Sequence, residues 1–133
     1  MTTDAFIASQ LKDRQDLLTN IHEAIVSGDT TVTATVGTMM GKQMILYTAD
    51  GVFKYGLSPV KNYISLHVMP IYGSPALYAK FKALLPAASF QKGCINFTHE
   101  GAMPLPVVRQ LIAACSKIDL KAMKEMYLQS KKG

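Results

Sequence analysis

Side chains that can hold a ligand alternate along one short segment near the middle of the chain. In the stretch KNYISLHVM, Tyr63, Ser65 and His67 occupy every second position. Successive side chains of a β-strand point to opposite faces, so these three are predicted to share one face of a sheet. A neutral imidazole can bind a metal or transfer a proton near neutral pH, and hydroxyls both donate and accept hydrogen bonds. This face is the first candidate for a ligand-binding surface.

Two further residues are candidates for the same surface. Tyr55 lies one predicted strand earlier, and Gly56 and Pro59 can each host a bulge that turns it toward either face. Lys92 precedes Cys94 by two positions, and an ammonium group beside a thiol lowers the pKa of the thiol. Tyr55 and Lys92 complete the predicted ligand-binding set.

The composition of this segment leaves three interpretations open. A tyrosine–histidine face can serve packing alone, bind a small ligand or a protein partner, or support catalysis. Metal sites usually need three or four ligands, and His22 and His99 lie far from His67 in the sequence. The sequence contains no G-x-S-x-G, Walker A, G-x-G-x-x-G or H-E-x-x-H motif, and no cysteine–histidine pair at a recognisable spacing. We therefore expect a non-enzymatic binding domain.

A second group of candidate ligands lies near the N-terminus. Asp13, Asp16 and Glu23 fall close to one face of a predicted helix. Carboxylate oxygens bind hard cations, so these residues form the predicted metal-binding set. Lys12 and Arg14 offset part of the negative charge, and an ordinary solvated helix face has the same composition.

The hydrophobic pattern predicts the elements that position these side chains. Apolar residues at three-, four- and seven-residue steps predict one helix over residues 4–27. Between residues 30 and 72 the period changes to two, which predicts four strands joined by turns. A helix should begin at Ser74-Pro75 and be followed by a fifth strand in GCINF. Two helices should complete the chain, the last beginning at Asp119.

The predicted order is therefore α-β-β-β-β-α-β-α-α. Clustered strands with helices at the ends favour a two-layer α+β domain, with a five-stranded antiparallel sheet and helices packed on one face. Ile64, Leu66 and Val68 should pack under the helices, so His67 and its alternate neighbours should face away from them. The length of 133 residues fits a single domain over 1–133.

Charge and composition exclude several partners. The net charge is +5, but Arg14 and Arg109 are the only arginines. Sequence-specific nucleic-acid recognition relies on arginine, so we do not expect it here. The uncharged stretch over residues 30–41 is too short and polar to span a membrane, and the first residues lack the pattern of a signal peptide. We expect a cytoplasmic protein in which Cys94 and Cys115 stay reduced.

With these motifs placed, the chain resembles the YdhG-like family, a group of small bacterial domains mostly of unknown function. The resemblance covers about residues 11–118. Its most specific pieces are Tyr55-Gly56-Leu57, the KNYISLH strand, Lys92-Gly93 before a strand that ends at Phe97, and Pro104-Leu105-Pro106.

The resemblance implies a frataxin-like topology and suggests a cargo. Some members of the family have been described as frataxin-like iron chaperones, and frataxins bind iron through carboxylates on the first helix. The matching positions here are Asp13, Asp16 and Glu23, with Asp29 after the helix. Weak iron binding or delivery is thus the first functional hypothesis. The alternative is a small-molecule or protein-binding module that uses the Tyr63–His67 face, with a second copy of the chain as one candidate partner.

Overall fold

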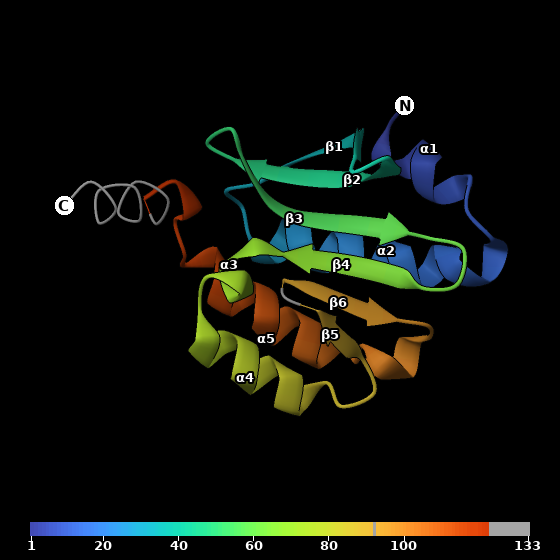
Figure 1. Cartoon of the computed structure of the whole chain (residues 1–133). Helices are drawn as coiled ribbons and strands as arrows, with labels where there is room; N and C mark the ends of the chain where they lie inside the picture. Colours follow the sequence, from blue (N-terminus) through green and yellow to red (C-terminus); the bar gives the residue numbers. More distant parts are fainter. Residues whose placement is uncertain (92, 123–133) are drawn as a thin grey trace.

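The chain forms a mixed α+β structure around one open, six-stranded antiparallel sheet (Figure 1). This structure is a computed structural model, and it describes residues 1–91 and 93–122. Lys92 and the part of the last predicted helix beyond residue 122 lie outside the described residues. The α+β class expected from the sequence is confirmed.

The strands follow the spatial order β1-β2-β3-β4-β6-β5, and each neighbouring pair is antiparallel. Their bounds are Thr33–Met39 (β1), Lys42–Ala49 (β2), Val52–Pro59 (β3), Ile64–Val68 (β4), Ser89–Gln91 (β5) and Cys94–Phe97 (β6). The expected four-strand meander is present as β1 to β4. The sheet has six strands rather than five because Ser89–Gln91 pairs with β6. Three residues carry too little period-two pattern to reveal a strand in the sequence.

Tight turns connect the first three strands. Met40 and Gly41 have φ angles of 53° and 77°, and Asp50 and Gly51 have φ angles of 51° and 75°. Two consecutive positive φ angles are the geometry that joins antiparallel strands without splaying them. The sequence predicts a turn at Gly41-Lys42, one residue later than the structure places it, and a second turn at Ala49-Asp50-Gly51, where the structure has it.

Up to residue 116 the helices are α1, α2, α3, α4 and α5, with one short 3₁₀ turn, η1. Their bounds are Thr3–Ala8 (α1), Lys12–Gly28 (α2), Met69–Tyr72 (α3), Pro75–Leu84 (α4), Glu100–Ala102 (η1) and Leu105–Ser116 (α5). Ser74 caps α4 through a hydrogen bond from Leu77 N, as its sequence predicted. Asp119 Oδ1 accepts a hydrogen bond from Ala122 N, which fits the expected start of a further helix.

The single N-terminal helix predicted from the sequence is wrong, because the segment forms two helices. At the break, the Ser9 hydroxyl and the Gln10 amide both donate to the carbonyl of Phe6. Such side chains compete with the backbone for its hydrogen bonds and end a helix. Phe6 stays buried, but Leu11, which the pattern assigned to the apolar stripe, is 65% exposed.

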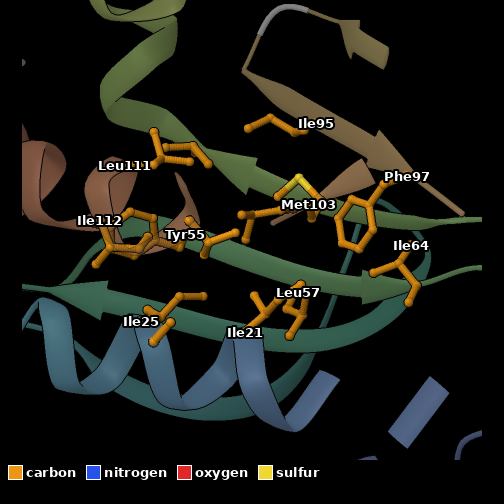
Figure 2. Packing of buried hydrophobic residues seen from close by; sticks show 14 of the residues in the cluster. Ile21, Ile25, Tyr55, Leu57, Ile64, Ile95, Phe97, Met103, Leu111 and Ile112 are labelled. Carbon is orange, nitrogen blue, oxygen red and sulfur yellow. The ribbon is translucent and has the colours of Figure 1, made fainter. Parts of the chain in front are cut away.

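The core lies between the sheet and the helices α2 and α5 (Figure 2). Ile64, Leu66 and Val68 are buried on this inner face, as predicted. Figure 2 shows Ile21 and Ile25 of α2 beneath the sheet. Both belong to one buried cluster that also contains residues of β2, β3, β4, β6 and α5. Hydrophobic burial thus fixes which face of each strand points away from these two helices.

A β-bulge places a charged side chain inside this core. Tyr47 pairs with Tyr55, whereas Thr48 pairs with Phe53, so Lys54 is the extra residue on β3. Lys54 Nζ lies 2.7 Å from Asp29 Oδ2, and both side chains are almost fully buried. The Tyr55 hydroxyl donates to the same carboxylate oxygen, also at 2.7 Å. The bulge therefore lets two consecutive residues of β3 reach one carboxylate.

Asp29 follows α2 and anchors the helix end to the sheet. Burial alone would raise the pKa of Asp29, but hydrogen bonds from Lys54, Thr31 and Tyr55 outweigh it and hold the pKa below its usual value. Thr31 donates to the other carboxylate oxygen through both its hydroxyl and its amide. The carboxylate is therefore ionised and fully hydrogen-bonded inside the protein.

Removing the ammonium group of Lys54 should show how much a buried Asp29 carboxylate without a cation destabilises the protein. We expect Lys54→Met to lower the free energy of unfolding by about 3–5 kcal/mol, because it leaves the Asp29 carboxylate without its cation. Combining it with Asp29→Asn should recover part of that loss, since no buried charge remains. Urea unfolding of both variants measures the effect, with Lys61→Met, at an exposed lysine, as the control. Equal losses for the single and the double variant would contradict this account.

Candidate functional site

The candidate site lies on the outer face of the sheet, the face turned away from α2 and α5. Two adjacent rows of residues cross β3, β4 and β6 there, the first formed by Gly56, His67 and Cys94 and the second by Ser58, Ser65 and Asn96. The members of each row are directly opposite one another in the antiparallel register. Rows of this kind bring side chains within contact distance across strands.

A depression of about 210 Å³ opens on these rows. It is lined by Tyr63, Ser65 and His67, the three residues that the sequence singled out. The volume corresponds to about seven water molecules, below the range of about 300–1,000 Å³ usual for drug-sized ligands. The depression therefore suits a ligand of few atoms, and the structure brings the three central candidates together around it.

Ser58 is the least expected member of the site. Its side chain is fully buried at the depression, and its hydroxyl has no hydrogen-bond partner among the residues that the structure describes. An unpartnered buried hydroxyl costs about 1–3 kcal/mol. The accessible area of the hydroxyl is below 1 Å², so a bound group can recover that cost only when a neighbouring side chain moves aside. In the sequence Ser58 looks like part of an interruption before Pro59, and nothing there signals burial.

His67 and Cys94 form a close pair across β4 and β6. His67 Nδ1 lies 2.9 Å from Cys94 Sγ, although the residues are 27 positions apart in the sequence. The sequence spacing gave no sign of this pair, because it depends on β4 pairing with β6 rather than on a local motif.

The pair is neutral near pH 7. Burial lowers the pKa of His67, and the positive charge of Lys42 lowers it further. Burial also raises the pKa of the Cys94 thiol. A nucleophilic cysteine needs the opposite, a thiol with a lowered pKa beside a cationic group. The electrostatics therefore favour binding over nucleophilic catalysis at this pair.

A second sulfur-containing side chain, Met44 of β2, lies across β3 from His67. A Cβ atom at Gly56 would be 3.1 Å from Met44 Sδ and 2.8 Å from the ring of Phe53. Gly56 thus gives Met44 room to place its sulfur over β3, next to the strand position opposite His67. Met39 and Met40 line the same depression. One end of the site is therefore rich in sulfur.

Tyr55 lies apart from this site. It is fully buried on the inner face, where it bonds to Asp29, because the bulge at Lys54 fixes its direction. Desolvation and the neighbouring carboxylate raise the pKa of its hydroxyl above the usual range. Lys92, the other outlying candidate, lies outside the described residues.

The predicted metal-binding carboxylates are not brought together. Asp13, Asp16 and Glu23 are all exposed on α2. Asp16 and Glu23 are about 10 Å apart along the helix axis, given a rise of about 1.5 Å per residue. Within residues 1–91 and 93–122, no group of three or more His, Cys, Asp or Glu side chains is placed to hold a metal ion. Arg14, beside them, donates to the carbonyls of Val60 and Lys61.

Comparisons with known proteins leave the family open. No family model, curated protein or solved structure matches the chain. In the part of the chain that the structure describes, no helix has both the length and the apolar character needed to cross a bilayer.

The histidine environments predict a loss of stability in mild acid. His67 and His22 both have lowered pKa values, chiefly through burial. Below about pH 6.5 the unfolded chain binds protons that the folded chain does not, so the free energy of unfolding should fall with pH, by at most about 1.4 kcal/mol per pH unit for each histidine. Above about pH 6.5 both histidines are neutral in the folded and in the unfolded chain, so they no longer change the free energy of unfolding with pH.

Urea unfolding between pH 7.5 and 5.5 measures this dependence. We expect His67→Gln to flatten it, because the substituted chain no longer gains that proton on unfolding. His99→Gln, at an exposed histidine, is the matched control and should leave the slope as it is in the wild type. An unchanged slope in His67→Gln would show that His67 is not held neutral by the fold.

Proposed function

We propose that the protein is a non-enzymatic binding domain that holds a small ligand in the depression on the outer face of its sheet. The observation that supports this most directly is the buried, unpartnered hydroxyl of Ser58 at the depression. Folding retains a costly group there, and a buried polar group without a partner calls for an explanation such as a bound water, ion or ligand group. The volume of about 210 Å³ limits the ligand to few atoms.

The second row of residues, called the polar row from here on, determines which chemical groups a ligand in the depression must carry. Ser58, Ser65 and Asn96 lie side by side in the register and line the depression, together with the ammonium group of Lys42. Hydroxyl and amide groups can donate to a ligand, and an ammonium group only donates. No carboxylate is found among the described lining residues. We therefore infer a ligand that carries hydrogen-bond acceptors.

A test uses small fragments as probes. We expect fragments of about ten non-hydrogen atoms or fewer to shift the backbone amide resonances of Ser58, Ser65 and Asn96 in ¹H–¹⁵N spectra. Ser58→Ala should weaken the best fragment about two- to tenfold, the value of one hydrogen bond. Ser27→Ala, at an exposed serine of α2, should leave its affinity unchanged.

The stability of the free protein gives an independent check. Ser58→Ala removes a buried group that lacks a partner, so the ligand-free variant should unfold at equal or higher urea concentration than the wild type. A gain in stability combined with a loss of affinity is the signature of a binding residue. Fragment shifts confined to other surfaces, or a clear destabilisation by Ser58→Ala, would overturn the proposal.

A protein partner on the same face, including a second copy of the chain, is the alternative. Tyr63 is half-buried at the edge of the depression, and Met40 nearby is 75% exposed. If two copies pair through this face, Tyr63→Ala should shift the molar mass in light scattering toward that of one chain. A mass that matches one chain in both proteins would exclude the dimer and leave the small-ligand proposal standing.

Three predictions rest on the sequence resemblance alone. They are membership of the YdhG-like family, a frataxin-like topology and iron binding by α2. Ferrous iron added to the protein under anaerobic conditions tests the last of them. Binding at this set should move the amide resonances around Asp13, Asp16 and Glu23. We rank it below the sheet-face proposal because these carboxylates are exposed and spread along the helix.

A further inference from the structure

The ammonium group of Lys42 lies within reach of the polar row. Ile45 pairs with Leu57, so the next residues, Met44 and Ser58, lie opposite each other on the outer face. Lys42 comes two positions before Met44 on the same strand, which makes it the diagonal neighbour of Ser58. Diagonal neighbours in a sheet are roughly 7–8 Å apart, a distance that a long side chain can span. Lys42 can therefore place its charge over β3.

This positive charge acts across the depression and is not balanced there. Burial lowers the pKa of His67 most, and the charge of Lys42 lowers it further, although β3 separates their strands. Salt screens exposed charges beyond about 10 Å, so this effect indicates a Lys42 side chain that extends over the sheet. Within the described residues, no carboxylate lines the depression and no ion pair includes Lys42.

We propose that the ligand of the depression is a short-chain carboxylate, whose charge pairs with Lys42 and whose oxygens accept hydrogen bonds from the polar row. The inference rests on the proposed small-ligand function and names the class of ligand. Ser65 lies directly opposite Ser58 and keeps 6% of its surface exposed at the depression, whereas Ser58 keeps none. A carboxylate can therefore reach Lys42 and Ser65 first. It reaches Ser58 when a neighbouring side chain moves aside.

The lining favours a carboxylate over phosphate. Phosphate sites commonly use the planar fork of arginine or the amides at a helix N-terminus. Among the described residues, neither an arginine nor a helix residue lines the depression, and Lys42 is its one cationic side chain. Met39, Met40 and Met44 line the side formed by β1, β2 and the turn between them. Flexible thioether side chains pack well against a small hydrocarbon group. One cation and an apolar wall match a monoanion with a short apolar tail.

The experiment compares two probes of nearly equal shape, butyrate and its neutral amide, butyramide. Both are small enough for a depression of about 210 Å³. Each is titrated into the ¹⁵N-labelled full chain at pH 7.5 and constant ionic strength. We expect both to shift the amide resonances of Ser65 and Asn96. Butyrate should bind roughly five- to tenfold more tightly, because hydrogen bonds to a charged group are stronger than neutral ones. Inorganic phosphate should bind more weakly than butyrate.

A charge variant identifies the counter-ion. Lys42→Gln should lower the affinity for butyrate to that for butyramide and leave the affinity for butyramide unchanged. Lys61→Gln is the matched control, because Lys61 is also exposed but does not line the depression. It should leave both affinities as they are in the wild type. Equal losses of butyrate affinity in the two variants would overturn the proposal, since they would show attraction to the net charge of +5 rather than to one ammonium group.

A second measurement needs only the wild-type chain. Cys94 of β6, 2.9 Å away, and Lys42 of β2 are the titratable groups that act on His67 from neighbouring strands. A carboxylate bound between Lys42 and Ser65 adds a negative charge near His67, so saturating butyrate should raise the pKa of its imidazole. Butyramide should not. Imidazole resonances followed through a pH titration measure the change, with exposed His99 as the internal control. A pKa of His67 that is the same with both probes would overturn the placement.

These outcomes separate the ligand class from the small-ligand function itself. Equal affinities for butyrate and butyramide, with shifts at Ser65 and Asn96, would reject the carboxylate and leave the small-ligand function standing. Tighter binding of phosphate than of butyrate would reject the carboxylate in the same way. If neither probe and no neutral fragment moves these resonances, both proposals fail.

Discussion

The buried ion pair between Asp29 and Lys54 is the constraint on which the rest of the structure depends. It joins the end of α2 to the third strand of the sheet, with Tyr55 bonded to the same carboxylate oxygen. A buried charge pair is retained only where its geometry is good and its remaining hydrogen bonds are satisfied. Here a β-bulge makes Lys54 the extra residue of β3, so that Lys54 and the next residue, Tyr55, both reach the Asp29 carboxylate. This interaction fixes how the first long helix is attached to the strands that carry the candidate site.

Polar chemistry in this protein is divided between two faces with different roles. On the inner face the charges and hydroxyls of Asp29, Thr31 and Tyr55 satisfy one another, so their consequence is stability. On the outer face the Ser58 hydroxyl has no partner within the described part of the chain, and a neutral His67–Cys94 pair lies beside it. Because its groups keep unused hydrogen-bonding capacity, the outer face is the candidate binding side of the sheet.

The sequence predicted the outer face correctly where a local pattern was enough. Alternation along KNYISLH placed Ile64 and Leu66 in the core and Ser65 and His67 on the opposite side, as the structure has them. It could not settle the direction of Tyr55, because that depends on a bulge whose register is set by two strands together. The split of the first helix was missed for a similar reason, since side-chain hydrogen bonds at Ser9 and Gln10 override an apolar stripe.

The amino-acid sequence by itself determined the α+β class, most of the elements and the inward or outward direction of most strand residues. These follow from periodicity and turn chemistry, which act over a few residues. Only the tertiary structure decided which distant residues meet. The pairing of β4 with β6 puts Cys94 against His67, and the small size of Gly56 brings the sulfur of Met44 over β3. Such contacts depend on long-range strand order, which local patterns do not encode.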